Sequence, residues 1–209
     1  MASRPKQAEP RPAPRLYLVT PPATAPADLQ AALEAADVAA VLLCLPDGDE
    51  RDLINRVKTL APLVQGKGVA LLLGGHPEIV ARSGADGAHL TGIDVFNAAL
   101  EQLKPDWIAG AGGLTTRHDA MAAAEAGADY IMFGGQDVAL AVTQDGVSWA
   151  SELFELPCVA FAKGADEVAP LTGAGADFIA VDFIWRAPRG AAAAIADAAQ
   201  YLRLPEAVS

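Results

Sequence analysis

Short apolar runs alternate with segments of mixed polarity along the chain. Each run spans only a few residues and lacks the regular polar alternation of a half-exposed strand, which is typical of strands buried on both faces of a parallel sheet. The runs predict eight strands, at Leu16–Thr20, Val38–Leu45, Val69–Leu73, Gly87–Leu90, Asp106–Gly110, Asp129–Phe133, Pro157–Ala162 and Phe178–Phe183.

The segments between these runs predict helices. In Pro26–Ala36, apolar residues recur at helical spacing and share one face. Asp49 stands where it can cap the next helix, which we expect to end before Pro62. Gln136–Gly146 reads as an irregular insertion. The other helices are expected in a short segment ending at Ser83 and at Asp94–Leu103, Ala120–Ala126, Ser148–Glu155, Asp166–Gly173 and Pro188–Leu204.

A three-residue joint recurs between helix and strand. It reads Gly84-Ala-Asp86, Gly127-Ala-Asp129 and Gly175-Ala-Asp177, and an apolar strand follows each time. The glycine is typical of the position just after a helix. The helix before the middle joint also has a clear start, because Thr116 and Asp119 have the spacing of a capping box. The repetition indicates a recurring turn at one end of a parallel sheet.

The alternation of strands and helices predicts the α/β class. Parallel strands joined by right-handed helical crossovers are expected, and eight such units close into a (β/α)₈ TIM barrel. We expect a single compact domain over residues 15–209. A doubly wound open sheet is the alternative, but no GxGxxG joint follows the first strand.

Residues 1–14 differ in composition from the rest. They are rich in proline and alanine, carry Arg4, Lys6 and Arg11, and lack the apolar stretch of a secretory signal. A disordered arm is expected. A functional basic arm is the alternative.

Composition excludes several classes of partner. The formal net charge of −11 argues against nucleic acid and anionic membrane surfaces. No uninterrupted apolar stretch approaches the length of about 18 residues that a membrane span needs. Cys44 and Cys158 have no CxxC or histidine spacing around them, so a metal cluster is not indicated. Reduced thiols in a cytoplasmic protein are the simplest interpretation.

In such a barrel the active site lies at the carboxyl ends of the strands. Lys163 and Gly164 follow the seventh strand and open a helix, which favours a phosphate site made of backbone N–H groups and one cation. The alternative is that Lys163 neutralises Asp182, which ends the next strand.

Histidines and Asp94 are the other candidates for chemistry. His89 lies at the end of the fourth strand and Asp94 follows five residues later, and the two suggest a base or a metal ligand. The alternatives are a hydrogen-bonded loop histidine and an N-cap aspartate. His76 is a candidate acid or base without a carboxylate nearby in sequence. His118 is expected on the surface, and Cys44 is expected to fill space.

The order of these segments resembles the thiamine phosphate synthase family, including its thiazole tautomerase branch. The resemblance covers roughly residues 15–203 and follows five segments. They are LYLVT (16–20), GVALLLGGHPEIVARSGADGAHLTGID (68–94), IAGAGG (108–113), AGADYIMFGG (126–135) and LPCVAFAKGADEVAPLTGAGADFIAV (156–181). The resemblance implies a TIM barrel that joins hydroxymethylpyrimidine diphosphate to thiazole phosphate, with Mg²⁺ neutralising the departing pyrophosphate.

Several positions that carry this chemistry in the family differ here. The family's Arg-Glu-Lys after the second strand reads Cys44-Leu-Pro46, and its Asn-Asp after the third strand reads Gly74-Gly75. A serine aligns with Gly112, and the tautomerase histidine aligns with Leu114. The Thr and Lys after the sixth strand have no counterpart in Gly135–Ala141, and the Gly-Gly of the thiazole phosphate site reads Lys163-Gly164.

Asp94 aligns with the one magnesium carboxylate that remains. Because several stabilisers of about 3 kcal/mol each are missing, Mg²⁺ is doubtful and efficient synthesis is not expected. We expect a synthase-like protein that uses His76, Asp94 or Lys163 in a changed mechanism.

The alternative is a non-catalytic barrel. It would bind a small phosphorylated or heterocyclic ligand, or a protein partner, in an open mouth formed by Gly74, Gly75, Gly112, Gly113, Gly134 and Gly135. A homodimer is possible in either case, although no apolar helix stripe marks its interface.

Overall fold

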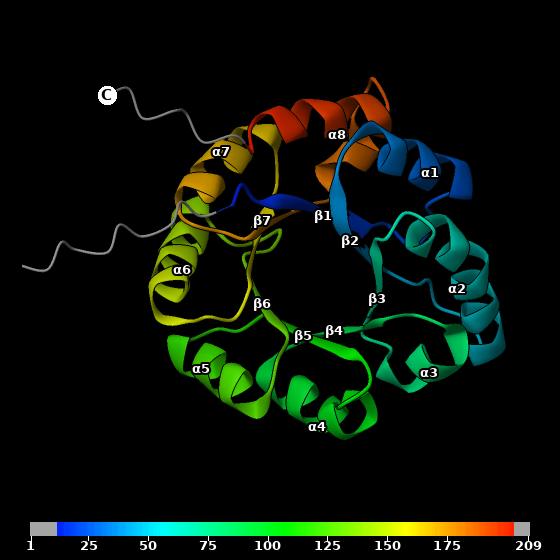
Figure 1. Ribbon diagram of the computed structural model, residues 1–209, viewed down its shortest axis with the longest axis horizontal. Helices are drawn as coiled ribbons and strands as arrows, with labels where there is room; N and C mark the ends of the chain where they lie inside the picture. Colours follow the sequence, from blue (N-terminus) through cyan, green and yellow to red (C-terminus); the bar gives the residue numbers. More distant parts are fainter. Residues whose placement is uncertain (1–11, 203–209) are drawn as a thin grey trace, which may run out of the picture.

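The computed structural model describes residues 12–202 and shows the predicted (β/α)₈ barrel (Figure 1). Eight parallel strands close in the order β1 to β8. The strands are β1 Arg15–Thr20, β2 Val38–Leu43, β3 Ala70–Gly74, β4 Gly87–Thr91, β5 Ile108–Gly112, β6 Tyr130–Phe133, β7 Cys158–Ala162 and β8 Phe178–Val181.

Helices surround the barrel and cover its outer face (Figure 1). They are α1 Pro26–Ala35, α2 Glu50–Gln65, α3 Val80–Ser83, α4 Ile93–Leu103, α5 Arg117–Ala126, α6 Leu140–Leu153, α7 Ala165–Gly173 and α8 Ala191–Gln200, with 3₁₀ turns at Pro77–Ile79 (η1) and Phe183–Arg186 (η2). No helix within the described range is long and apolar enough to cross a membrane. The arm predicted over residues 1–14 falls mostly on residues 1–11, which lie outside the described residues.

The second helix extends further than predicted. The second helix was expected to end before Pro62, but α2 continues through this residue to Gln65. Proline normally weakens a helix interior, yet Leu60 and Val64 on either side of it are buried, so packing maintains the helix. As predicted, the side chain of Asp49 caps α2 by accepting a hydrogen bond from the Asp52 N–H at 3.0 Å.

The predicted irregular insertion at Gln136–Gly146 is wrong, because α6 begins at Leu140. Thr143, Val147 and Ala150 lie at helical spacing and are buried against the barrel. Gly146 masked this pattern in the sequence. A Cβ on this glycine would meet the Phe133 ring at 2.7 Å, so the glycine lets α6 lie close to β6.

Strand bounds shift by one or two residues. β5 ends at Gly112 rather than at Gly110, because Gly112 still pairs with Thr91 of β4. β2 ends two residues early and β8 ends at Val181, where the chain turns into η2. The terminal helix starts at Ala191 rather than at Pro188, and its predicted end falls outside the described residues.

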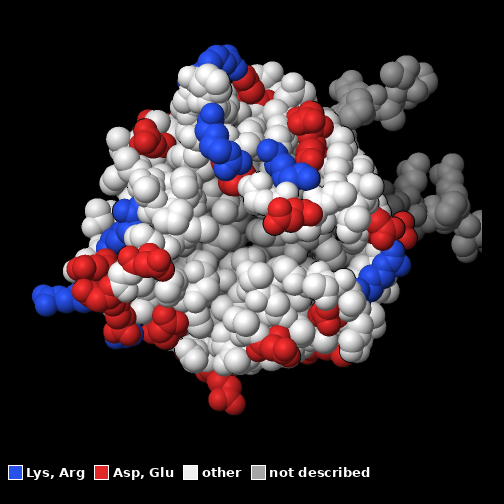
Figure 2. All heavy atoms as spheres, turned by 180° about the vertical axis from the view of Figure 1, so that it is seen from behind, with Lys and Arg blue, Asp and Glu red and all other residues white. Residues whose placement is uncertain are grey.

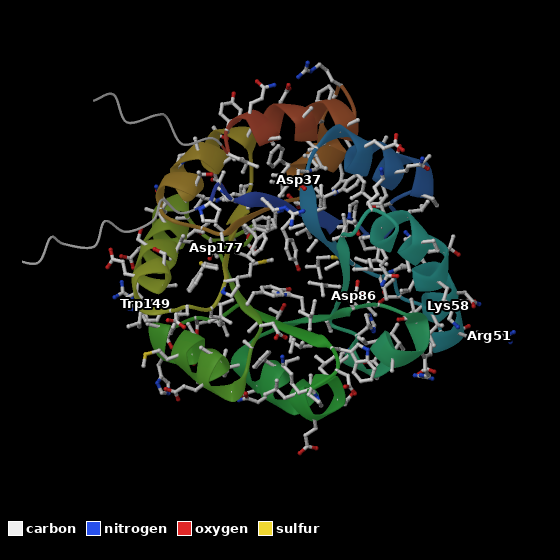
Figure 3. All side chains as sticks on the ribbon, viewed as in Figure 1. Asp37, Arg51, Lys58, Asp86, Trp149 and Asp177 are labelled. Carbon is white, nitrogen blue, oxygen red and sulfur yellow. The ribbon has the colours of Figure 1, made fainter. Side chains whose placement is uncertain are left out.

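The aspartates of the repeated joint tie neighbouring strands together. Asp86, Asp129 and Asp177 each accept a hydrogen bond from a backbone N–H of the preceding odd-numbered strand, at Leu71, Ala109 and Cys158, over 2.7–2.8 Å. Asp37, before β2, pairs instead with Arg15 of β1 at 2.8 Å. Figure 3 shows Asp37, Asp86 and Asp177 around the barrel, whereas Arg51 and Lys58 of α2 point outward. The capping box predicted at Thr116 and Asp119 is likewise formed, with both of its hydrogen bonds present.

The inside of the barrel forms its own apolar cluster, separate from the core between strands and helices. Its buried members are Tyr17, Ala40, Leu42, Leu72, Tyr130, Met132, Val159, Phe161 and Ala180. Beyond Ile108, the inward positions of β5 are the glycines Gly110 and Gly112. A Cβ on Gly110 would meet the Tyr130 ring at 2.1–2.4 Å, and a Cβ on Gly112 would meet His89 Nε2 at 2.5 Å. The two glycines therefore make room for these two rings.

Three buried polar side chains form a chain across the interior. The hydroxyl groups of Tyr17 and Tyr130 are 2.8 Å apart, and the Tyr130 hydroxyl lies 2.9 Å from His89 Nδ1. The His89 and Tyr130 rings also stack, with centroids 5.7 Å apart. Burial lowers the pKa of His89 to about 4 and raises the pKa of both tyrosines. The interior network is therefore neutral at physiological pH.

The close contact at β5 predicts that Gly110→Ala is destabilising. The added methyl group must displace the Tyr130 ring, and overpacking of this kind costs about 1–3 kcal/mol. Urea unfolding measures the loss. Gly173→Ala at the end of α7 is the matched control, since nothing lies within 4 Å of its Cβ position. Equal stability of both variants would contradict the packing described for Tyr130.

The buried histidine predicts a pH dependence of stability. Unfolded His89 takes up a proton below about pH 6.5, whereas the folded protein resists protonation until about pH 4. Stability therefore falls as the pH drops between these values, by up to about 3 kcal/mol. His89→Gln should flatten this part of the profile in urea unfolding. Exposed His118→Gln is the control and should leave it unchanged.

Candidate functional site

The carboxyl ends of the strands surround the mouth of the barrel. Side chains alternate along a strand, so residues two positions beyond the interior cluster also face inward. By this rule the rim of the mouth consists of Cys44, Gly74, Gly134, Lys163 and Asp182. In Figure 2, basic and acidic side chains gather beside a hollow at the centre of the molecule.

Lys163 lies at this rim but does not pair with Asp182. Its Nζ donates to the Val138 carbonyl oxygen at 2.7 Å and lies 3.8 Å from Glu167 Oε1. Asp182 instead accepts from Gln136 Nε2 at 2.5 Å and pairs with Arg186 at 3.1 Å. The alternative that Lys163 neutralises Asp182 is therefore wrong, and each cation at this rim has a different carboxylate partner.

The start of α7 contains the predicted phosphate-binding residues, but acidic side chains already occupy it. Gly164 is the N-cap, and the first turn carries Asp166 and Glu167. Glu167 Oε2 accepts the Lys163 backbone N–H at 2.8 Å. A Cβ on Gly164 would meet Asp166 Oδ1 at 2.6 Å. A phosphate entering here would displace or repel two carboxylates.

Asp94 stands apart from these groups. It is exposed on the first turn of α4, whose N-cap is Gly92, so the interpretation of Asp94 as an N-cap is wrong. No cluster of three His, Cys, Asp or Glu side chains that could hold a metal occurs among residues 12–202. Mg²⁺ needs oxygen ligands in octahedral geometry and usually takes one or two carboxylates plus substrate phosphates. One exposed carboxylate does not make a preformed magnesium site.

The histidines are separated by the fold. His76 precedes η1, and its Nδ1 lies 3.1 Å from Glu78 Oε1, so it does have a carboxylate partner. His89 lies within β4 rather than in a loop, and the described hydrogen bond of its imidazole is to Tyr130. His118 is exposed on α5, as expected. The structure therefore does not combine a histidine with Asp94 or Lys163.

Cys44 is half-buried at the rim. Burial, and then the nearby charge of Asp182, raise the pKa of this thiol. A raised pKa disfavours the nucleophilic thiolate, which agrees with the prediction that Cys44 fills space. Cys44 and Cys158 are not joined by a disulfide.

A cavity of about 310 Å³ adjoins the mouth between β5, β6 and α6. Its lining includes Gly113 and Gly134, two of the six glycines predicted to form the mouth. The other lining residues are Leu114, Thr115, Met132, Phe133, Val138, Val142 and Thr143. Sequence reasoning missed the contributions of Val138, Val142 and Thr143, because it treated their segment as irregular. It also missed Glu167 and Gln136, although a carboxylate in the first turn of α7 was a visible signal.

The sequence comparisons all identify thiamine phosphate synthases as similar to this chain. Residues 16–182 match the family model described as thiamine monophosphate synthase. Thiamine-phosphate synthase of Rhodospirillum centenum is 41% identical over 90% of this chain and 98% of its own length. The enzyme of the same name from Hyphomonas neptunium is 38% identical over 90% of this chain and 93% of its own length.

Solved structures show the same fold. Thiamine phosphate pyrophosphorylase from Pyrococcus furiosus superimposes with a TM-score of 0.77 at 21% identity, over 90% of this chain and 95% of that chain. GGGPS from Thermoplasma volcanium has the same coverage of this chain, with a TM-score of 0.66 at 16% identity.

The match to the family model over most of the barrel, together with relatives that share more than a third of their residues with it, shows that this chain belongs to the thiamine monophosphate synthase family.

Proposed function

We propose that this thiamine phosphate synthase-like protein binds a heterocyclic thiamine precursor at its barrel mouth, without efficient coupling of hydroxymethylpyrimidine diphosphate to thiazole phosphate. The observation that carries this proposal is that Lys163 of the rim, and Arg186 four residues after Asp182, both lie near carboxylates of the chain itself. Lys163 lies near Glu167, and Arg186 pairs with Asp182. Neither cation is available for a diphosphate without breaking these contacts.

The floor of the mouth supports binding of a ring. Leu42, Met132 and Phe161 belong to the interior cluster but keep 6–9% of their surface exposed. Small-molecule sites commonly combine an apolar floor with a few polar groups at the rim. Here the rim supplies Gln136, Lys163 and Asp182, so a planar heterocycle with hydrogen-bonding substituents fits the chemistry.

The negative charges at the rim disfavour the departure of pyrophosphate, because this step adds negative charge to the mouth. Catalysis of this transfer needs positive groups aimed at the oxygens that gain charge, each worth about 3 kcal/mol. The segments after β2 and β3 present Cys44 and Gly74 at the positions where the family resemblance calls for charged or amide side chains. With Asp182 and Glu167 also present, the mouth stabilises added negative charge poorly.

Bound Mg²⁺ would add little stabilisation of the negative charge on pyrophosphate. Asp94 would be its one carboxylate from this chain, and the described acidic residues do not gather around it. A phosphorylated heterocycle remains our proposed ligand, with the heterocycle providing most of the binding. We also place the protein in the cytoplasm, which the two thiols without a mutual disulfide support.

The coupling reaction tests this proposal directly. With both precursors, Mg²⁺ and high protein concentration, we expect thiamine phosphate to form no faster than without protein. Isothermal titration with thiazole phosphate should still show binding. Rapid, magnesium-dependent turnover would contradict the proposal, and absence of binding by any precursor would contradict the ligand assignment.

The acidic start of α7 yields a second prediction. Glu167→Gln keeps the shape of the side chain and its hydrogen bond to the Lys163 N–H, but it removes the negative charge near Lys163 Nζ. A charge at a helix N-terminus is worth up to about 1 kcal/mol, or about fivefold in affinity. Titration should therefore show severalfold tighter binding of thiazole phosphate. Glu125→Gln on exposed α5 is the control and should bind like the unaltered protein.

A further inference from the structure

A second cavity lies at the end of the barrel opposite the mouth. It has a volume of about 270 Å³ and is open to solvent. Its lining residues lie at or next to the starts of the strands, which places it at the amino-terminal end. They are Tyr17, Ala39, Ala40, Ala70, Leu72, Ile108, Asp129, Tyr130, Pro157, Val159 and Phe178.

The cavity exists because this end of the barrel is built from small residues. TIM barrels usually fill their interior with layers of bulky branched side chains. Here the inward positions at the starts of β2, β3 and β4 are Ala40, Ala70 and Gly87. A Cβ on Gly87 would lie 2.1 Å from the Ile108 carbonyl oxygen, so this position tolerates only glycine. The missing volume is not replaced by other described side chains.

Aromatic rings form much of the cavity wall. Tyr17 and Tyr130 lie on its inner side, with ring centroids 5.8 Å apart and planes tilted by 59°. Phe178 contributes a third ring from the start of β8. Apolar surface predominates, and tilted aromatic walls favour offset or edge-to-face contact with another ring. The shape and surface therefore suit one small aromatic molecule.

The negative charge at the amino-terminal end of the barrel favours positively charged aromatic molecules over neutral or negative ones. Asp129 lines the cavity, and its Oδ2 binds the Ala109 N–H and Lys104. Its Oδ1 has no partner among residues 12–202. Asp86 and Asp177 stand at the same end and form no ion pair with any described cation. An anion would be repelled, whereas a positively charged group would meet Asp129 and the two tyrosine rings that line the cavity.

We propose that this cavity is a binding site for a monocyclic aromatic amine, with its ring between Tyr17, Tyr130 and Phe178 and its ammonium group at Asp129. The site is distinct from the mouth, where a phosphorylated ligand is expected. The two sites are nevertheless connected, because the Tyr17 and Tyr130 hydroxyl groups lead by hydrogen bonds to His89. A ligand that moves either tyrosine would therefore act on the floor of the mouth.

Three probes that share a ring but differ in charge test the proposal. Benzylamine, benzyl alcohol and benzoate are titrated against the full chain, with chemical shifts of the tyrosine side chains followed by NMR. We expect benzylamine to bind at least tenfold more tightly than benzyl alcohol, and benzoate to cause no saturable shift. Binding of benzoate as tight as that of benzylamine, or no binding by any probe, would overturn the proposal.

Substitutions in the cavity test whether benzylamine binds there. Ala70→Leu fills the cavity and should abolish the benzylamine shifts, and Ala40→Leu provides a second filling variant if the first fails to fold. Ala31→Leu on the exposed face of α1 is the control and should bind normally. Asp129→Asn keeps the acceptor for the Ala109 N–H and should remove the preference for benzylamine over benzyl alcohol. Unchanged binding in a folded cavity-filling variant would overturn the assignment.

Discussion

The contact between two glycines of β5 and two aromatic rings determines how the barrel is filled. Gly110 and Gly112 leave no side-chain volume on their side of the interior, and the rings of Tyr130 and His89 occupy that space. The Tyr130 hydroxyl then lies within hydrogen-bond distance of Tyr17 on the opposite side. One asymmetric layer thus spans the barrel, with the ligand-sized mouth on one side of it and the amino-terminal cavity on the other.

This layer also bears on the serine that the family resemblance aligns with Gly112. A side chain at this position would collide with His89 Nε2, so a serine there requires a different position of the imidazole. The change is therefore coupled to the packing of the interior and not only to the chemistry of the mouth. Around the rim, Glu167 and Asp182 meet the described cations, so the electrostatic character of the mouth follows from pairs within the chain.

Much of the fold was predictable because its signals are local. Apolar runs, the joint glycines and the capping residues each act within a few positions, and the closed barrel follows from their alternation. The errors arose where tertiary packing overrode a local signal. Pro62 did not end α2, and Gly146 did not prevent α6, because buried neighbours on each helix maintain it.

The site was less predictable than the fold, because it depends on where side chains from distant segments of the sequence point. Lys163 and Gly164 were placed correctly at a strand end, but the sequence does not show that Lys163 turns toward Val138 and Glu167 rather than Asp182. His89 was predicted at the end of the fourth strand, as observed, but its partner Tyr130 comes from a distant strand. Asp94 and His76 lie on separate turns, which only the three-dimensional arrangement reveals.

Four aspartates, Asp37 and those of the three joints, link the eight strands in pairs. Each aspartate connects an even-numbered strand with the odd-numbered strand before it, so β1 with β2, β3 with β4, β5 with β6, and β7 with β8 each form a side-chain-linked pair. The β8–β1 pairing is one of the boundaries between such pairs. A circularly permuted chain that begins at β3, β5 or β7 would keep all four links intact, which makes this barrel modular in a way that its continuous sheet conceals.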